Sequence, residues 1–137
     1  MQNHKFITNY VADWLKRADE DTQAAEVLLT DGGLSNSVCF HSQQAAEKYL
    51  KAFLAFQEKH IRKVHDLVVI LTLCEEIDQS FKDLRDDVSY LSKFYIETRY
   101  PGDYPRFARR EASEALKSVL KIKEFVWEKI KNKKERE

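Results

Sequence analysis

The sequence predicts an all-α fold, an antiparallel up-and-down bundle of about five helices. The chain of 137 residues contains only three glycines and two prolines, whereas a sheet protein of this length needs many turn-forming residues. Apolar residues recur at spacings of three and four through most of the sequence, which is the period of an amphipathic helix. The segments between these patterns are short, as in bundles whose consecutive helices pack antiparallel.

The composition indicates one domain. Apolar residues make up 43% and charged residues 34% of the chain, which excludes a disordered protein. We expect a single helical domain over residues 1–137, with its core at about 10–131 and a charged tail at 132–137. No segment has the apolar length of a membrane span or the hydrophobic run of a signal peptide, so we expect a cytoplasmic protein without a membrane partner.

The first helix is expected from about Tyr10 to Thr30, ending at the glycines of "DGG". Its apolar stripe contains Val11, Trp14, Ala18, Thr22, Ala25 and Leu29.

The second helix is expected from a Ser35 cap to about Lys59. Its apolar face is formed by Val38, Ala45, Ala46, Tyr49, Ala52, Phe53 and Phe56. A polar stripe follows the opposite side and contains His41, Gln44, Lys48 and Lys51. Such a stripe is most simply the solvated face of the helix, and a binding surface is the alternative.

A third, shorter helix is expected to begin near His65 and Asp66. Its apolar residues are Leu67, Ile70, Leu71, Cys74 and Ile77. His65 most simply caps this helix, and its alternative role is that of an acid, a base or a phosphate ligand. Cys74 and the other cysteine, Cys39, lie in apolar patterns, so we interpret both as buried thiols rather than a disulfide.

The fourth helix is expected from about Asp83 to Arg99, because Pro101 disfavours helical geometry at Tyr100. Its predicted buried stripe is Leu84, Val88, Leu91, Tyr95 and Thr98. The fifth helix is expected from about Phe107 to Lys131, with an apolar stripe of Ala112, Leu116, Val119, Ile122, Val126 and Ile130.

The connection "TRYPGDYPRFARR" between the last two helices is the most unusual stretch of the chain. Its "YPGD" suits a type II turn. Arg106, Arg109 and Arg110 gather where the fifth helix begins, and cations at that end oppose the helix dipole, so helix stability does not explain them. Arg99 either caps the carbonyls of its own helix or pairs with Asp103, and the functional alternative is that it serves as an anion clamp.

Common enzyme motifs are absent from the sequence. There is no glycine-rich phosphate loop, no nucleophile elbow and no metal-ligand spacing of His and Cys, so we expect no metal and no cofactor. The 23 basic and 23 acidic residues give a formal net charge of zero. This balance argues against a long nucleic-acid track and leaves room for a local anion site.

Three blocks together resemble the HEPN domain family. They are "FHSQQAAEKYLKAFL" (40–54), "HDLVVIL" (65–71) and "YLSKFYIETRYPGDYP" (90–105), and the likeness extends over roughly residues 10–130. The resemblance implies a helical bundle that commonly forms a homodimer and accompanies a separate minimal nucleotidyltransferase. Other branches of the family are metal-independent ribonucleases, including toxins of toxin–antitoxin pairs.

The sequence departs from the ribonuclease branches at one position. Those branches carry an arginine followed four to six residues later by a histidine. Arg99 matches the arginine, but Asp103 and Tyr104 stand near the place of the histidine, and no histidine follows His65. Neither side chain replaces an imidazole near neutral pH, which argues against nuclease activity and leaves no catalytic residue to name.

The leading hypothesis is therefore a non-catalytic module that binds a nucleotide or another substrate, or RNA. Its expected phosphate- or nucleotide-binding residues are Arg99, Tyr100, Asp103, Tyr104, Lys48, Lys51 and His65. The alternatives are a metal-independent ribonuclease toxin and a structural subunit that docks an enzyme.

Overall fold

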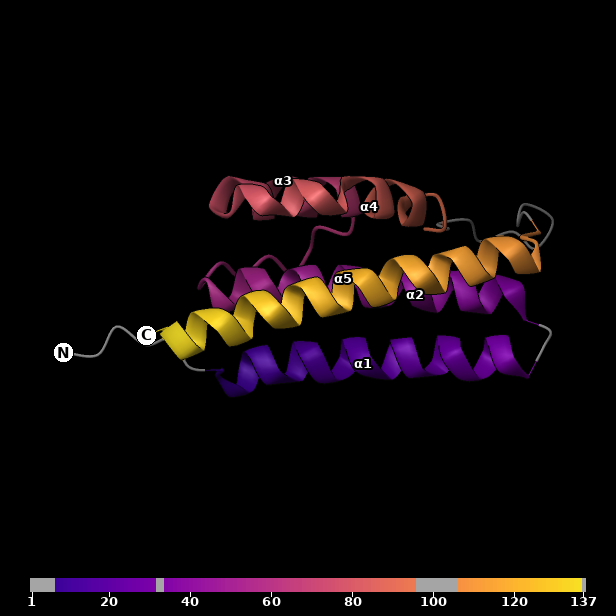
Figure 1. Ribbon diagram of the computed structural model, residues 1–137, viewed down its shortest axis with the longest axis horizontal. Coiled ribbons are helices and arrows are strands. Elements are labelled where there is room, and N and C mark those ends of the chain that lie inside the picture. Colours follow the sequence, from indigo (N-terminus) through magenta and orange to yellow (C-terminus); the bar gives the residue numbers. More distant parts are fainter. Residues whose placement is uncertain (1–6, 32–33, 96–105, 137) are drawn as a thin grey trace.

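Five α-helices and one 3-10 helix make up the part of the chain that the computed structural model describes, residues 7–31, 34–95 and 106–136 (Figure 1). They are α1 (Asn9–Thr30), α2 (Ser35–Phe56), α3 (Leu67–Ile77), η1 (Gln79–Leu84), α4 (Arg85–Ser92) and α5 (Arg109–Arg136). These segments include no strand, and the predicted all-α bundle is confirmed. None of these helices has both the length and the apolar character that crossing a membrane requires.

Helix α2 is the centre of the bundle. It packs against α1 on one side and α5 on another, and it also contacts α3 and α4. Figure 1 shows α1 on one side of the α2 and α5 pair, with the shorter α3 and α4 on the other. Because α2 is covered from several directions, most of its side chains have little contact with water.

Small residues let α1 and α2 approach each other closely. Ala45, Ala46 and Ala52 of α2 and Ala18 and Ala25 of α1 have no exposed surface. The predicted apolar face of α2 is confirmed, since all seven of its residues are buried. Where α2 meets η1 and α5, the rings of Phe53, Phe81 and Phe125 contact one another in sequence, with centroids 4.4 and 4.9 Å apart.

Two predicted helix caps are wrong. Helix α2 begins at Ser35 itself, and its N-cap residue is Leu34, whose side chain makes no capping hydrogen bond. Helix α3 is capped by Asp66 and not by His65, since the Asp66 carboxylate accepts hydrogen bonds from the amides of Val68 and Val69.

The predicted fourth helix begins differently from what the apolar pattern suggested. The chain turns helical at Gln79, because the Asp78 carboxylate accepts a hydrogen bond from the Ser80 amide and starts η1. Phe81 and Leu84 of η1 are both buried, and a spacing of three matches the three residues per turn of a 3-10 helix.

Helix α4 also ends earlier than predicted, at Ser92. The amides of Phe94 and Tyr95 bond the carbonyls three residues before them, so the chain tightens here. As a result Phe94 is buried, and Tyr95, which the helical period placed in the core, is 38% exposed. The predicted buried Thr98 and helix end at Arg99 lie outside the described residues.

Helix α5 extends to Arg136, beyond the predicted end at Lys131. The added residues are mostly Lys, Glu and Arg, which are good helix formers.

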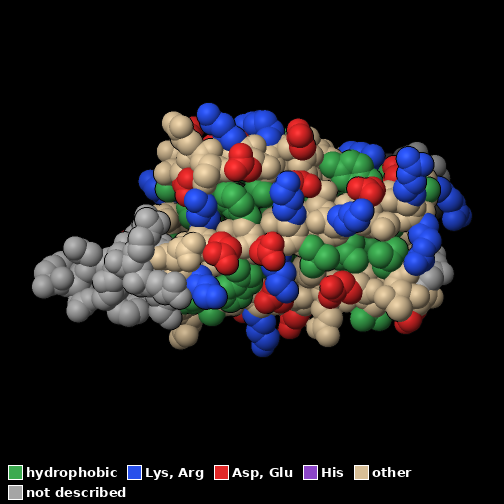
Figure 2. Space-filling model, viewed as in Figure 1, with side chains coloured by type: hydrophobic (Ala, Val, Ile, Leu, Met, Phe, Trp, Pro, Cys, Tyr) green, Lys and Arg blue, Asp and Glu red, His purple; other side chains and the backbone are tan. Residues whose placement is uncertain are grey.

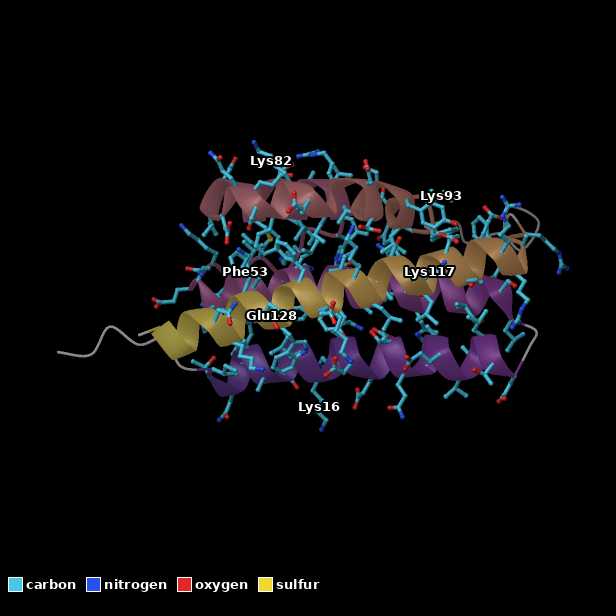
Figure 3. The ribbon with its side chains drawn as sticks, viewed as in Figure 1. Lys16, Phe53, Lys82, Lys93, Lys117 and Glu128 are labelled. Atoms are coloured by element: carbon cyan, nitrogen blue, oxygen red, sulfur yellow. The ribbon has the colours of Figure 1, made fainter. Side chains whose placement is uncertain are left out.

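Lys16 and Lys82 point away from the bundle on opposite sides (Figure 3). On the face seen in Figure 2, basic and acidic side chains are interspersed, with no large area of one sign.

Both cysteines are free, buried thiols. Burial, together with the nearby charge of Glu111, raises the pKa of Cys39 to about 11. Burial also raises the pKa of Cys74, whose Sγ lies 3.7 Å from the Leu50 carbonyl oxygen. The interpretation of these residues as core thiols is confirmed.

A polar pocket where α2, α3 and α4 meet

A row of polar side chains lies inside the bundle, on one face of α2. Gln43, Glu47 and Lys51 follow one another at spacings of four residues, and their exposed fractions are 0%, 6% and 2%. Polar and charged groups in a core are costly unless they are partnered. Stability alone would favour apolar residues here, so the row suggests a role beyond packing.

Glu47 is the hub of this row. Its Oε2 accepts a hydrogen bond from Lys51 Nζ at 2.9 Å and lies 2.8 Å from Nδ1 of His65. Lys51 Nζ also donates to the carbonyl of Arg62 at 3.0 Å and stands 5.6 Å from the centre of the Trp14 ring. The ammonium of Lys51 is therefore enclosed by protein groups.

His65 connects this buried pair to the surface. Its side chain is 52% exposed. An ionised carboxylate can only accept hydrogen bonds, so the bond to Glu47 places the ring proton on Nδ1 of His65. In the neutral ring Nε2 then carries the lone pair, and in the protonated ring it becomes a second donor.

His65 lies on the wall of a pocket of about 410 Å³. The pocket is formed by the middle of α2, the start of α3 and the end of α4, and its lining residues are Gln43, His65, Asp66, Leu67, Ser92 and Tyr95. Two buried atoms next to this site have no hydrogen-bond partner among the described residues, Nε2 of Gln43 and Oε1 of Glu47. Buried polar atoms are rarely left unpaired in folded proteins.

Side-chain contacts link the end of α4 to the start of α5 beside this pocket. Lys93 Nζ lies 3.4 Å from a carboxylate oxygen of Glu111 and 4.4 Å from the centre of the Tyr90 ring. The Tyr90 hydroxyl donates to the backbone carbonyl of Glu111 at 3.1 Å. The pKa of Glu111 is lowered by two causes. The larger is a hydrogen bond from the Ala108 amide, and the second is the hydrogen bond and charge of Lys93. These contacts hold together the two helices that the predicted arginine-rich connection joins.

Of the seven residues predicted for the site, four lie outside the described residues. They are Arg99, Tyr100, Asp103 and Tyr104. The three arginines predicted near the start of α5, Arg106, Arg109 and Arg110, are all exposed.

The other three predicted residues do not form one surface. Lys51 and His65 share Glu47, whereas Lys48 pairs with Asp21 of α1. Asp21 also binds Nδ1 of His41 at 2.9 Å. The interpretation of this stripe as a solvated face is wrong for Lys51, which is buried, whereas His41, Gln44 and Lys48 are partly exposed.

Sequence reasoning missed Gln43, Glu47, Ser92 and Tyr95 as residues of this site. One signal was available, since positions 43, 47 and 51 repeat every four residues and so share a helix face. Tyr95 could not be found in this way, because its exposure depends on α4 ending at Ser92, three residues before Tyr95.

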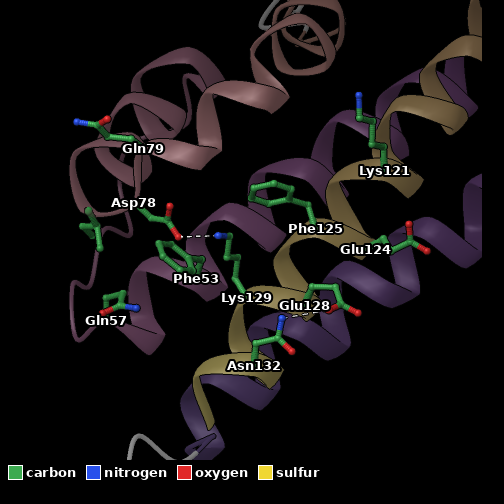
Figure 4. A pocket seen from close by; sticks show the side chains of 11 residues that line it. Phe53, Gln57, Asp78, Gln79, Lys121, Glu124, Phe125, Glu128, Lys129 and Asn132 are labelled. Carbon is green, nitrogen blue, oxygen red and sulfur yellow. Dashed lines mark hydrogen bonds and ion pairs between the residues drawn. The ribbon is translucent and has the colours of Figure 1, made fainter. Parts of the chain in front are cut away.

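A second hollow of about 650 Å³ lies between α2, the start of η1 and α5 (Figure 4). Phe53 and Phe125 form part of its lining, and the ion pair of Asp78 and Lys129, 2.9 Å long, stands within it. Its α5 side carries two lysines and two glutamates, so it favours neither sign of charge. Within the described residues, no group of three or more His, Cys, Asp and Glu side chains could hold a metal ion.

Comparison with known families decides what kind of domain this is. The family described as "HEPN domain" matches residues 11–133. The chain belongs to the HEPN domain family. The resemblance carried by the three sequence blocks is thereby confirmed, and the polar pocket is a feature of a HEPN bundle.

Three individual proteins are similar to this chain over nearly their whole length. The chain is similar to the crystal structure of TT1696 from Thermus thermophilus, with a TM-score of 0.71 and 34% identity over 89% of this chain and 99% of that one. It is similar to ST0689, described as an archaeal HEPN homologue, with a TM-score of 0.66 and 30% identity over 88% and 97%. A protein of Methanocaldococcus jannaschii named "Putative toxin MJ1304" is 29% identical over 97% of this chain and 96% of its own length.

Proposed function

We propose that the protein is a non-catalytic HEPN module that binds the phosphate of a nucleotide and acts with a separate minimal nucleotidyltransferase. One observation carries the proposal: a polar pocket with a histidine on its wall lies next to a core that is mostly apolar. Pockets with a few convergent polar groups are the usual form of a ligand site.

His65 and Arg99 would hold the phosphate together. Protonated His65 can donate from Nε2 while Glu47 keeps the ring in place through Nδ1. Arg99 follows Tyr95 by only four residues in the sequence, which is the reason for including it in the proposed site. Tyr100 or Tyr104 would contact the base or sugar. Lys51 supports His65 through Glu47 and does not touch the ligand.

Calorimetric titration with nucleoside monophosphates tests this proposal. We expect Arg99→Ala and His65→Gln each to weaken binding by about tenfold, the loss of one charge-assisted hydrogen bond. Lys16→Ala, a change of an exposed cation on α1, is the control and should bind like the wild type. Unchanged binding in Arg99→Ala would remove that residue from the site.

We further infer that the protein is a homodimer and that its nucleotidyltransferase partner is a separate chain. These partners follow from the family resemblance. A neighbouring reading frame that encodes a small nucleotidyltransferase, together with recovery of the two proteins as one complex, would support the pairing. Failure of the co-expressed proteins to associate at low salt would argue against it.

A metal-independent ribonuclease toxin is the second candidate, favoured by the oriented imidazole of His65 and by the toxin proposed in the name of the Methanocaldococcus relative. A neutral imidazole with a free Nε2 can accept the proton of a ribose 2′-hydroxyl. Incubation with transfer and messenger RNA in the presence of a chelator distinguishes the two functions. Cleavage that is lost in both Arg99→Ala and His65→Asn would establish the nuclease, and intact RNA would favour the binding module.

A further inference from the structure

Gln43 is the residue of the pocket whose chemistry the proposed function leaves unused. Its Oε1 accepts a hydrogen bond from Nε2 of Gln44 at 2.8 Å. Its own Nε2 is buried and has no hydrogen-bond partner in the part of the chain that the structure describes. The side chain has no exposed surface, yet it lines the pocket. Among the residues that line the pocket, Gln43 therefore carries a buried donor that no described residue uses.

An unused buried donor favours a ligand that brings an acceptor. Such a donor has lost its hydrogen bonds to water without gaining others, so an acceptor that reaches it recovers an interaction that the empty pocket lacks. Ligands without this acceptor gain nothing there, and a polar site discriminates strongly against them. The carbonyl oxygens and ring nitrogens of nucleobases are acceptors of this kind.

The rim of the pocket supplies the second feature that a base requires. Tyr95 lies on the rim and is 38% exposed, so its ring is available to a planar ligand. Bases commonly stack on exposed aromatic side chains. Ser92 lies on the same wall, and its hydroxyl can both donate and accept.

The size and the position of His65 agree with a single nucleotide. A volume of about 410 Å³ falls within the range of small-molecule sites and is too small for a duplex. His65 stands on the pocket wall with Nδ1 bound to Glu47, which leaves Nε2 for a phosphate or sugar oxygen. Inorganic phosphate would leave both Gln43 and Tyr95 without a role.

We propose that this pocket recognises the base as well as the phosphate, with Gln43 donating to an acceptor on the base edge and Tyr95 stacking on its face. The inference rests on the proposed function and names its ligand class, a single nucleotide, either free or at an unpaired position of RNA. Because Nε2 of Gln43 is covered in this structure, binding requires the rim side chains to shift.

Titration of the full chain with a nucleoside monophosphate, ribose 5-phosphate and inorganic phosphate tests the base contact. We expect the nucleotide to bind at least tenfold more tightly than ribose 5-phosphate. Gln43→Met, which keeps the length of the side chain and removes the donor, should lose about tenfold for the nucleotide and nothing for ribose 5-phosphate. Gln23→Met, the same change at an exposed position of α1, is the matched control.

Tyr95→Ala gives a second variant, at a position that is not in the core, in case Gln43→Met fails to fold. It should also reduce the preference for the nucleotide, whereas Tyr95→Phe should keep it. Equal binding of nucleotide and ribose 5-phosphate, unchanged in Tyr95→Ala, would overturn the base contact and leave the phosphate site standing. No binding of any of the three ligands would overturn the proposed function itself. A single-stranded oligonucleotide that binds more tightly than the free nucleotide would identify RNA as the source of the base.

Discussion

Glu47 has an unusual position for an acidic residue, because it is almost completely buried and one oxygen serves two partners. Lys51 and His65 both meet Oε2, while Oε1 has no partner. Removing one member of a buried ion pair leaves the other charge without compensation, and the cost is large. An exposed pair with the same i, i+4 spacing contributes little. The chain contains a buried and an exposed ion pair with this spacing, so the exposed pair serves as the control for the buried one.

We predict that Glu47→Gln lowers the free energy of unfolding by about 3 kcal/mol, because Lys51 is left charged in the core. The double variant Glu47→Gln with Lys51→Met should lose less, since no unpaired charge remains. Asp13→Asn, which breaks the exposed 2.9 Å pair with Arg17, should cost under about 1 kcal/mol. Urea unfolding measures all three. Equal losses in Glu47→Gln and Asp13→Asn would contradict the buried pair.

Cys39 gives the unfolding free energy a dependence on pH. Burial, and then the charge of Glu111, raises the pKa of this thiol from 9.0 to about 11. Between these values the unfolded chain releases the thiol proton and the folded chain keeps it, so stability falls as pH rises. We predict lower stability at pH 10 than at pH 8 in urea unfolding, and a smaller drop in Cys39→Ala. An identical drop in that variant would exclude Cys39 as a cause.

At the level of elements, the long helices and the short α3 were well predicted, whereas η1 and α4 were not. The first and second helices begin within one residue of their predicted starts. Their apolar stripes are long, so the period decides them. The region after α3 was mispredicted because two local contacts override the period, the Asp78 side chain at the start of η1 and the tight turn after Ser92.

The observed cap Asp66 and the wrongly predicted cap Ser35 can be compared by mutation. Asp66→Ala should lower the free energy of unfolding by about 1 kcal/mol, because the amides of Val68 and Val69 lose their acceptor. Ser35→Ala should change it by less than about 0.5 kcal/mol, since Ser35 is inside α2 and caps nothing. Thermal or urea unfolding of both variants checks this order, and a larger loss in Ser35→Ala would reverse the assignment of the caps.

For the whole molecule, the sequence predicted the class of the fold and part of the candidate site. His65 was named as a candidate acid, base or phosphate ligand, and it does lie on the pocket wall, while that role stays a prediction. The buried row of Gln43 and Glu47 was not named, because a helical period shows which residues share a face but not how many faces are covered. Only the packing of α1, α3, α4 and α5 around α2 puts a polar face in the interior. A residue's environment depends on this arrangement, which local pattern does not contain.

Assembly of the whole molecule is open to a direct test. Val27 near the end of α1 and Leu34 and Phe40 at the start of α2 are large apolar side chains with exposed fractions of 52%, 56% and 42%. They all lie near the turn that joins α1 to α2, and exposed apolar groups that gather in one region commonly mark an interface. If the inferred homodimer uses this end of the bundle, a charge placed there should separate the two copies.

We therefore predict that light scattering of the wild-type protein gives twice the monomer mass and that the combined change Leu34→Asp with Phe40→Asp gives the monomer mass. Leu120→Asp, at an apolar residue of α5 that is 37% exposed, is the control and should leave the dimer intact. The helical circular dichroism of the double variant should be unchanged, because neither residue is in the core. A wild-type protein that is monomeric at every concentration would contradict the homodimer. A double variant that stays dimeric would place the interface elsewhere on the bundle, away from the α1–α2 turn.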